Sequence, residues 1–158
     1  MSKQTAVFGA GCFWGVELEF SKIPGVISTE VGYMGGLEEK KTYSYGEVCT
    51  GETRHAEVVK VVFDSDKISY SNLIDVFWKI HNPTTFNRQG LDVGSQYRSV
   101  IFYFDESQKR EAENSLKKEE KKIEKKIVTQ IVPAGEFYKA EEYHQKYLEK
   151  QVRESCRI

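Results

Sequence analysis

The segment Gly9–Trp14, with the sequence Gly-Ala-Gly-Cys-Phe-Trp, constrains the fold more than any other part of the chain. It follows a short apolar run and precedes a predicted helix, so the chain has to turn sharply between a strand and a helix. Gly9 and Gly11 permit such a turn, because glycine accepts backbone conformations that other residues avoid. Cys12 therefore stands at a helix start, where free backbone N–H groups and the helix dipole favour an anion.

Cys12 is accordingly predicted to be a reactive cysteine. A thiol in such a position has a pKa of roughly 3.5–7.5 instead of about 8.5, which makes it a thiolate at neutral pH. Phe13 and Trp14 place apolar surface beside it, as expected for an enzyme that acts on a small apolar group. The alternative is a structural cysteine packed among core aromatic residues. The rest of the chain decides between the two interpretations.

The length of 158 residues favours one domain, residues 1–158, large enough to fold around its own core without disulfides or metals. The formal net charge of -1 gives no electrostatic reason to expect a nucleic-acid or membrane partner. Neither a secretory signal nor a run of about eighteen apolar residues occurs in the sequence. We therefore expect a monomeric, cytoplasmic protein.

The cysteines also indicate a reducing compartment. Cys12, Cys49 and Cys156 are too few, and odd in number, for a secreted disulfide framework. They are better interpreted as free, catalytic or redox-active thiols, and no Cys-x-x-Cys motif indicates a thioredoxin-type dithiol or a zinc ribbon. Adding His55 and His144 to the cysteines gives spacings poorly suited to zinc. We expect no metal and no bound cofactor.

The hydrophobic pattern predicts a mixture of strands and helices without strict βαβ alternation. The predicted strands are Thr5–Gly9, Val26–Tyr33, Ala56–Phe63, Tyr97–Phe104 and Ile127–Val132. The predicted helices are Phe13–Phe20, a helix from Ser69 or Ser71 to His81, Ser107–Lys126 and Glu141–Arg153, with long ordered loops at Leu37–His55 and Thr84–Gln96. This mixture favours a two-layer α+β sandwich with a central mixed β-sheet, a ferredoxin-like core and packed helices. From about residue 150 we expect a mobile C-terminal tail that carries Cys156.

Three groups of polar residues lie outside the predicted core. Glu57 stands at the start of a strand, where an apolar aromatic pocket would raise its carboxyl pKa and keep it protonated, as a general acid requires. Asp92 and Tyr97 belong to a glycine-containing loop suited to orienting a polar oxygen. His144 and Tyr147 are predicted one helical turn apart on the last helix. Each group alone also has an ordinary structural explanation.

Short motifs occur in a fixed order along nearly the whole chain: residues 11–17 (GCFWGVE), 24–26 (PGV), 32–33 (GY), 35–36 (GG), 47–51 (EVCTG), 55–57 (HAE), 76–78 (VFW), 88–90 (RQG), 96–99 (QYRS), 140–145 (AEEYHQ) and 147–148 (YL). Chance cannot supply this whole set in order. The set resembles the A-type peptide-methionine (S)-S-oxide reductases.

The resemblance implies thiol-dependent reduction of the S epimer of methionine sulfoxide, free or in proteins. In that reaction the Cys12 thiolate attacks the sulfoxide sulfur while Glu57 protonates the oxygen. Phe13 and Trp14 enclose the S-methyl group of the substrate. The other substrate-binding residues that the resemblance implies are Tyr45, Asp92, Tyr97 and His144.

The resemblance also implies how the enzyme is recycled. The reaction leaves Cys12 as a sulfenic acid, which Cys156 resolves by forming a disulfide. A dithiol reductant, thioredoxin or dithiothreitol, then reduces this disulfide. Cys49 is better interpreted as a packed structural thiol than as a second resolving cysteine.

Two features depart from the family pattern. Arg54 stands where the family commonly has a glycine before the His-Ala-Glu motif, so we expect a local turn that differs from the family's. The loop before Cys49 is slightly longer than usual, which leaves both Tyr43 and Tyr45 as candidates for binding the sulfoxide oxygen. We favour Tyr45.

The residue chemistry alone permits other functions. A thiol peroxidase would also use a reactive Cys12, but it gains nothing from an apolar methyl pocket or from a general acid. A hydrolase would pair Cys12 with His144 as a cysteine–histidine dyad. A non-catalytic module would bind oxidised methionine peptides without consuming thiol.

Overall fold

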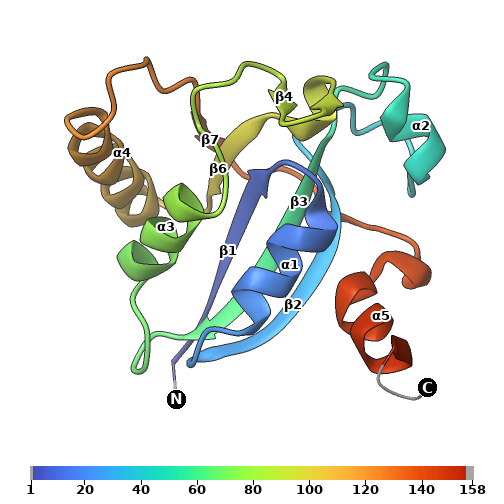
Figure 1. The fold of residues 1–158 in the computed structure, drawn as a ribbon, viewed down its shortest axis with the longest axis horizontal. Coiled ribbons are helices and arrows are strands. Elements are labelled where there is room, and N and C mark those ends of the chain that lie inside the picture. Colours follow the sequence, from blue (N-terminus) through green and yellow to red (C-terminus); the bar gives the residue numbers. More distant parts are fainter. Residues whose placement is uncertain (1, 156–158) are drawn as a thin grey trace.

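A six-stranded mixed sheet forms the centre of the computed structural model, which describes residues 2–155 (Figure 1). Its strand order is β7-β6-β1-β3-β2-β8, and neighbouring strands are antiparallel except for β6 and β7. These strands are β1 (Lys3–Ala10), β2 (Val26–Met34), β3 (Ala56–Asp64), β6 (Ser99–Tyr103), β7 (Gln130–Pro133) and β8 (Tyr138–Lys139). Two further short strands, β4 (Arg88–Gln89) and β5 (Asp92–Val93), pair as a separate hairpin.

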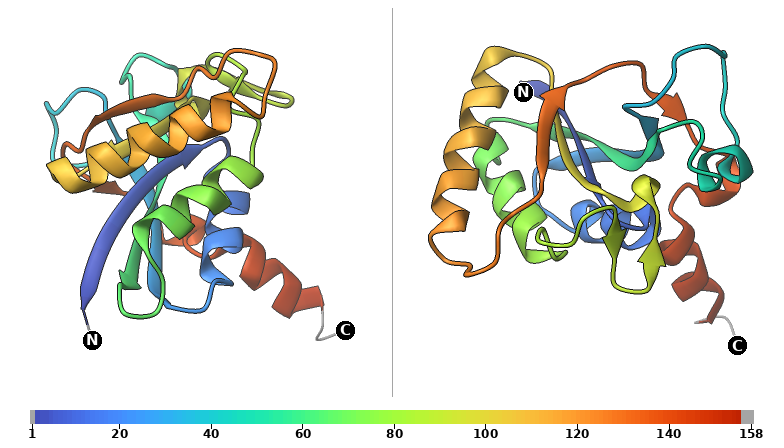
Figure 2. Two further views of the ribbon diagram at one scale, coloured as in Figure 1. Left: turned by 90° about the vertical axis from the view of Figure 1, so that its left-hand side faces the viewer. Right: turned by 90° about the horizontal axis from the view of Figure 1, so that it is seen from above.

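Helices cover one face of this sheet and complete the predicted two-layer α+β sandwich (Figure 2). The chain order β1-α1-β2-β3-α3-β6 together with the sheet order β6-β1-β3-β2 is the ferredoxin-like arrangement, which confirms the predicted core. The helices are α1 (Phe13–Ser21), α2 (Tyr45–Cys49), α3 (Tyr70–Lys79), α4 (Glu106–Glu120) and α5 (Tyr147–Ser155), with 3-10 turns η1 (Ser95–Tyr97) and η2 (Glu142–His144). None of the helices in this described range is long and apolar enough to cross a membrane.

Strand β1 is buried on both of its faces. Alternate side chains of β1 face the helices, and the fully buried ring of Phe8 lies 5.0 Å from that of Phe20 in α1 and 5.4 Å from that of Phe77 in α3. The opposite face of the sheet carries a smaller apolar cluster, which the chain between β7 and β8 covers. Because β1 is buried on both faces, the turn that follows it starts from a rigid strand.

The charged helix is shorter than predicted, since α4 ends at Glu120 and not at Lys126. Two isoleucines explain the early end: Ile127 is buried and Ile123 packs against the main core. The chain leaves helical geometry to bring both side chains inward, and the backbone N–H of Val128 then donates to the carbonyl of Pro83 over 2.9 Å. Strand β7 consequently begins at Gln130, three residues later than the predicted strand Ile127–Val132.

The last predicted helix, Glu141–Arg153, is two elements separated by a break. Lys146 has a φ of 54°, which a continuous helix cannot contain, and the side chain of Gln145 bonds to the backbone of Val31 at the edge of β2. The prediction that His144 and Tyr147 share one helical turn is therefore wrong. Helix α5 runs to Ser155, into the segment expected to be a mobile tail. The predicted resolving cysteine, Cys156, lies outside the described residues.

Candidate active site

Cys12 lies at the turn between β1 and α1, as the glycine pattern predicted. Gly11 has a φ of 100°, and a Cβ on it would lie 2.8 Å from Cγ of Gln89, so both backbone conformation and space require glycine here. Cys12 is half-buried and occupies the N-cap position of α1. The backbone N–H groups of Trp14 and Gly15 interact with its sulfur, as expected at a helix start.

The thiol of Cys12 nevertheless differs from the prediction of a thiolate at neutral pH. Burial raises its pKa above the ordinary value, and the nearby carboxylates of Glu57 and Asp92 raise it further. The N–H groups at the helix start lower the pKa, but they do not offset these effects. Cys12 is therefore a neutral thiol in the resting protein, because desolvation opposes the charged form more strongly than the helix start favours it.

Glu57 is the buried acid of the site. Glu57 is the second residue of β3 and is 1% exposed. Its Oε1 accepts a hydrogen bond from the backbone N–H of Phe13 over 3.2 Å. Desolvation raises the pKa of Glu57 to about 8, which confirms the predicted direction. Within the described part of the chain, Oε2 has no hydrogen-bond partner. Glu57 is thus protonated at neutral pH, with one oxygen available to a ligand.

Two tyrosine hydroxyls meet beside this carboxyl group. Tyr45 begins α2 and Tyr97 ends η1, and their hydroxyl groups interact with each other. Burial raises the pKa of both phenols, and the charge of Glu57 acts in the same direction. Both hydroxyls consequently stay neutral and can donate hydrogen bonds. Asp92, on β5, lies near enough to raise the pKa of Glu57.

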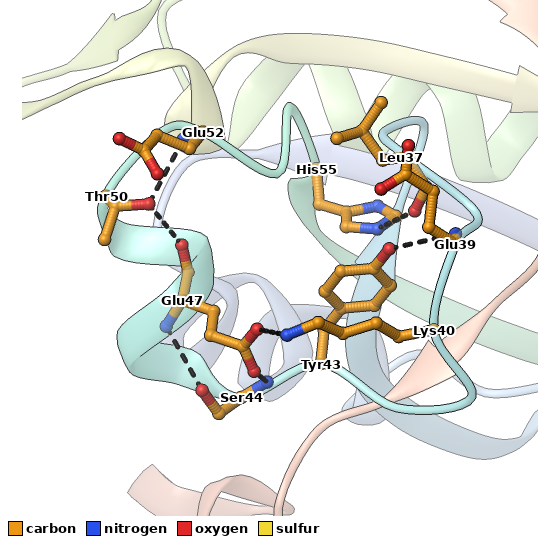
Figure 3. Close-up of polar contacts among 9 residues, drawn as sticks. All are labelled: Leu37, Glu39, Lys40, Tyr43, Ser44, Glu47, Thr50, Glu52 and His55. Carbon is orange, nitrogen blue, oxygen red and sulfur yellow. Dashed lines mark hydrogen bonds and ion pairs between the residues drawn. The ribbon is translucent and has the colours of Figure 1, made fainter.

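Tyr43 and Tyr45 occupy different places. The ring of Tyr43 is buried against His55 at 4.5 Å, and its hydroxyl accepts a hydrogen bond from the backbone N–H of Glu39 over 3.1 Å (Figure 3). The ring of Tyr45, in contrast, lies 6.3 Å from that of Phe13. Tyr45 is therefore the tyrosine that the loop brings to the site.

Helix α2 places Tyr45, although the sequence analysis treated this region as loop. The hydroxyl of Ser44 accepts from the backbone N–H of Glu47, while the Glu47 carboxylate accepts from the backbone N–H of Ser44 (Figure 3). This reciprocal pair is a capping box, and its Ser-x-x-Glu pattern was visible in the sequence. Cys49, at the end of α2, is exposed and interacts with the Tyr45 hydroxyl, so the prediction of a packed thiol is wrong.

Aromatic rings form the remaining walls. The ring of Phe13 is 1% exposed and lies 5.8 Å from that of Tyr33, at the base of the site. Trp14 is half-buried and stacks on Tyr147 with 3.9 Å between ring centroids. Its indole N–H donates to Nδ1 of His144 over 2.9 Å. His144 is thus part of the aromatic wall and orients the indole.

His144 is not arranged as a catalytic base. Its Nδ1 accepts a hydrogen bond from the indole N–H of Trp14, and burial lowers the pKa of the imidazole. Within the described residues, no hydrogen bond joins His144 to Cys12. The geometry gives no support to a cysteine–histidine dyad, and hence none to the hydrolytic alternative.

Glu141 was not among the predicted site residues, but it holds three parts of the site together. Its carboxylate accepts hydrogen bonds from the Tyr33 hydroxyl over 2.9 Å, from the Tyr45 backbone N–H over 3.0 Å and from the Tyr143 hydroxyl over 3.4 Å. It ties the start of α2 to β2 and to η2. The Ala-Glu-Glu-Tyr-His motif contained this residue, but nothing in the motif indicated contacts with residues about a hundred positions away.

The arrangement is unsuited to zinc. In residues 2–155 no group of three or more histidine, cysteine, aspartate or glutamate side chains could hold a metal ion. Both ring nitrogens of His55 are already bonded, Nδ1 to the backbone N–H of Gly36 and Nε2 to the carbonyl of Leu37. His55 therefore braces the loop that follows β2.

A thiol at a helix start, a protonated carboxyl group and two neutral phenols, set among aromatic side chains, define a cysteine-dependent enzyme. Residues 4–158 match the family described as peptide methionine sulfoxide reductase, and the chain belongs to that family. It is an oxidoreductase.

Related proteins and structures agree with this assignment. The chain is 60% identical over 155 residues to MsrA of Methanothermobacter thermautotrophicus, covering 97% of this chain and 90% of that relative. It is 54% identical over 158 residues to MsrA of Geobacter sulfurreducens, covering 99% of this chain and 96% of that relative. The structure of reduced Mxr1 from Saccharomyces cerevisiae is similar with a TM-score of 0.91 at 38% identity, covering 95% and 86%. Mxr1 in complex with Trx2 is similar with a TM-score of 0.65 at 25% identity, covering 92% and 84%.

Proposed function

We propose that the chain reduces the S epimer of methionine sulfoxide, free or in proteins, with Cys12 as nucleophile and Glu57 as general acid. The observation that carries this proposal is the protonated, buried carboxyl group of Glu57, which has Oε2 unpartnered in the described structure and lies near the Cys12 thiol. A sulfoxide needs both groups, because its sulfur becomes electrophilic as its oxygen accepts a proton or hydrogen bond. A peroxidase or a simple binding module would not require this acid.

In the first step, the Cys12 sulfur attacks the sulfoxide sulfur and loses its proton, which passes to Glu57 as Glu57 gives its own proton to the sulfoxide oxygen. The bond between this oxygen and the substrate sulfur then breaks. The oxygen ends on the sulfur of Cys12 as a sulfenic acid, and methionine is released. The substrate sulfur is reduced by two electrons and the Cys12 sulfur is oxidised by two, so atoms and electrons balance.

The protonation states of Cys12 and Glu57 are linked. An ionised Glu57 opposes formation of the Cys12 thiolate, whereas a protonated Glu57 does not. The resting protein therefore holds a neutral thiol, which is slow to react with general oxidants. The thiolate of Cys12 therefore forms more readily while Glu57 keeps its proton, which is also the state in which Glu57 can act as an acid.

The pocket walls assign roles to the other residues. The hydroxyls of Tyr45 and Tyr97 donate hydrogen bonds to the sulfoxide oxygen, where negative charge develops. Asp92 orders this network from the hairpin side. Phe13 and Trp14 enclose the S-methyl group, and His144 holds the indole of Trp14 in place through the 2.9 Å hydrogen bond.

Thiols supply the electrons for recycling, without a resident cofactor. The thiol of Cys156 attacks the sulfenic acid of Cys12, which forms a disulfide and releases water. Thioredoxin then reduces the disulfide by thiol–disulfide exchange. The similarity to yeast Mxr1 in its complex with Trx2 supports this choice of reductant.

Separate incubation with the S and R epimers of N-acetyl-methionine sulfoxide tests the proposal. Dithiothreitol serves as reductant, and chromatography measures the methionine product. We expect reduction of the S epimer only, lost in Cys12→Ser and slowed about 10²- to 10⁴-fold in Glu57→Gln, the usual range for general acid catalysis. Turnover of the R epimer, or full activity of Glu57→Gln, would contradict it.

A further inference from the structure

Several exposed apolar side chains belong to segments that also supply residues of the candidate active site. In the described range, the large apolar side chains that stand exposed include Leu91, which is fully exposed, Val93 at 71%, Phe86 at 70% and Tyr143 at 58%. A single exposed apolar side chain is ordinary, but several on the segments that form one site are typical of an interaction surface. We call these four residues the apolar rim.

Three of the rim residues belong to the β4–β5 hairpin and the loop that precedes it. This hairpin is held close to Cys12, because Gln89 packs directly against Gly11 and Asp92 raises the pKa of the Cys12 thiol. Leu91 and Val93 flank Asp92 in the sequence. The hairpin protrudes beside the N-terminal end of α1, as Figure 2 shows from above. These side chains consequently project from an element that already forms part of the site.

The fourth rim residue comes from another part of the chain. Tyr143 lies in η2, and its ring centroid is 4.1 Å from that of His144. Its hydroxyl donates to the Glu141 carboxylate over 3.4 Å, which anchors the exposed ring. The rim therefore includes apolar groups attached to two separate walls of the site.

The other exposed apolar residues lie at the opposite end of the sheet. Ile27 is near the start of β2, whereas Tyr33, at the other end of this strand, pairs with Glu57. This separation of six positions corresponds to about 20 Å of strand. Phe104 likewise follows the end of β6 remote from Ser99, the residue that pairs with Ala10 beside the catalytic turn.

We propose that the apolar rim binds the residues that flank methionine sulfoxide in an unfolded protein segment. This inference rests on the proposed function of Cys12. A methionine side chain that reaches Cys12 leaves its backbone at the mouth of the pocket, so the neighbouring residues must pass over the rim. Methionine is usually buried in folded proteins, among other apolar residues, and unfolding exposes these together. Continuity with the substrate pocket thus selects an apolar polypeptide as the occupant.

The test compares a protein substrate with a small one. The substrates are an oxidised, unfolded protein and N-acetyl-methionine (S)-sulfoxide, and dithiothreitol is the reductant. The double variant Leu91→Ser/Val93→Ser should lose roughly tenfold in kcat/KM for the protein, mainly through KM, because partial burial of two aliphatic side chains stabilises a complex by about this factor. Turnover of the small substrate should change less than about twofold, since surface substitutions rarely disturb a fold.

Ile27→Ser is the matched control, because it removes an exposed aliphatic side chain remote from the site. It should leave kcat/KM for both substrates unchanged. Equal loss for both substrates in the hairpin variant would overturn the proposal, and so would no loss for either. A loss seen only when thioredoxin replaces dithiothreitol would also overturn it, because the rim would then bind the reductant. If the wild-type protein reduces neither substrate, the proposed function itself fails.

Discussion

Replacing Glu57 with glutamine should stabilise the fold while it removes the acid from the reaction. Glu57 is 1% exposed, and its pKa rises from 4.5 to about 8 on folding because burial disfavours the carboxylate. At neutral pH the unfolded chain is ionised at this position, whereas the folded chain is protonated. Folding therefore takes up a proton, so the free energy of unfolding falls as the pH rises.

The sign and size follow from linkage. The folded state binds one more proton than the unfolded state between pH 4.5 and about 8, so the free energy of unfolding falls by about 1.4 kcal/mol per pH unit in this window. At pH 7 the accumulated loss is at most about 3 kcal/mol. Glu57→Gln removes this loss and retains an oxygen for the N–H of Phe13. A buried amide N–H₂ group without a partner offsets about 1–3 kcal/mol of the gain.

Urea denaturation of wild-type protein and Glu57→Gln, from about pH 5 to pH 9 under reducing conditions, measures the effect. The stability of wild-type protein relative to the variant should decline with rising pH and level off above about pH 8. Glu30→Gln is the control: partial burial raises the pKa of Glu30, but Lys60 and Lys139 lower it overall. Its stability curve should run parallel to wild type in this range. A parallel curve for Glu57→Gln would refute the account of a neutral, desolvated acid.

Other substitutions test individual contacts of the site. Tyr45→Phe and Tyr97→Phe should each lower kcat/KM about 10²-fold, the usual effect of losing a donor to a developing oxyanion, whereas Tyr43→Phe should not alter turnover. Glu141→Ala should lower kcat/KM about tenfold or more, because the backbone N–H of Tyr45 at the start of α2 loses its acceptor. Circular dichroism should show that this variant stays folded. Arg54→Gly should raise the melting temperature with unchanged turnover, since a φ of 63° strains arginine by about 1 kcal/mol.

Much of the fold was predictable because its signals are local. The apolar alternation of residues 56–63 and the glycines around Cys12 fixed the central strand and the strand-to-helix turn within short windows. The missed α2 was also locally encoded, in the pairing of Ser44 with Glu47. A helix of five residues lacks the hydrophobic period on which the prediction relied.

The electrostatics of the site depended on the assembled fold. The helix start at Cys12 correctly indicated backbone N–H groups that favour an anion, but the opposing burial arises only once α1 packs beside Glu57. The rise in the pKa of Glu57 was predictable in direction, because a carboxyl group near an apolar aromatic pocket is desolvated. For Cys12 the balance of two opposing effects was not predictable.

Long-range side-chain contacts were beyond prediction from this one sequence. Glu141 and Gln145 bond to backbone groups 96 and 114 residues away, and they shape the segment that was expected to be one continuous helix. Arg54 gives a contrasting case. Its replacement of glycine raised the prospect of an altered turn, yet the arginine adopts the left-handed conformation that glycine prefers.

The pH dependence of a single turnover tests the central claim most directly. Reduced protein is mixed with N-acetyl-methionine (S)-sulfoxide without added reductant, and the methionine formed in the first turnover is timed by rapid quenching. The reaction needs an ionised Cys12 and a protonated Glu57, so the wild-type rate should be bell-shaped, with limbs that belong to the coupled pair. Glu57→Gln should react at least about 10²-fold more slowly. Its rate should rise with pH as the thiolate forms and should not fall again at high pH. An unchanged bell in Glu57→Gln would contradict the assignment of Glu57 as the acid.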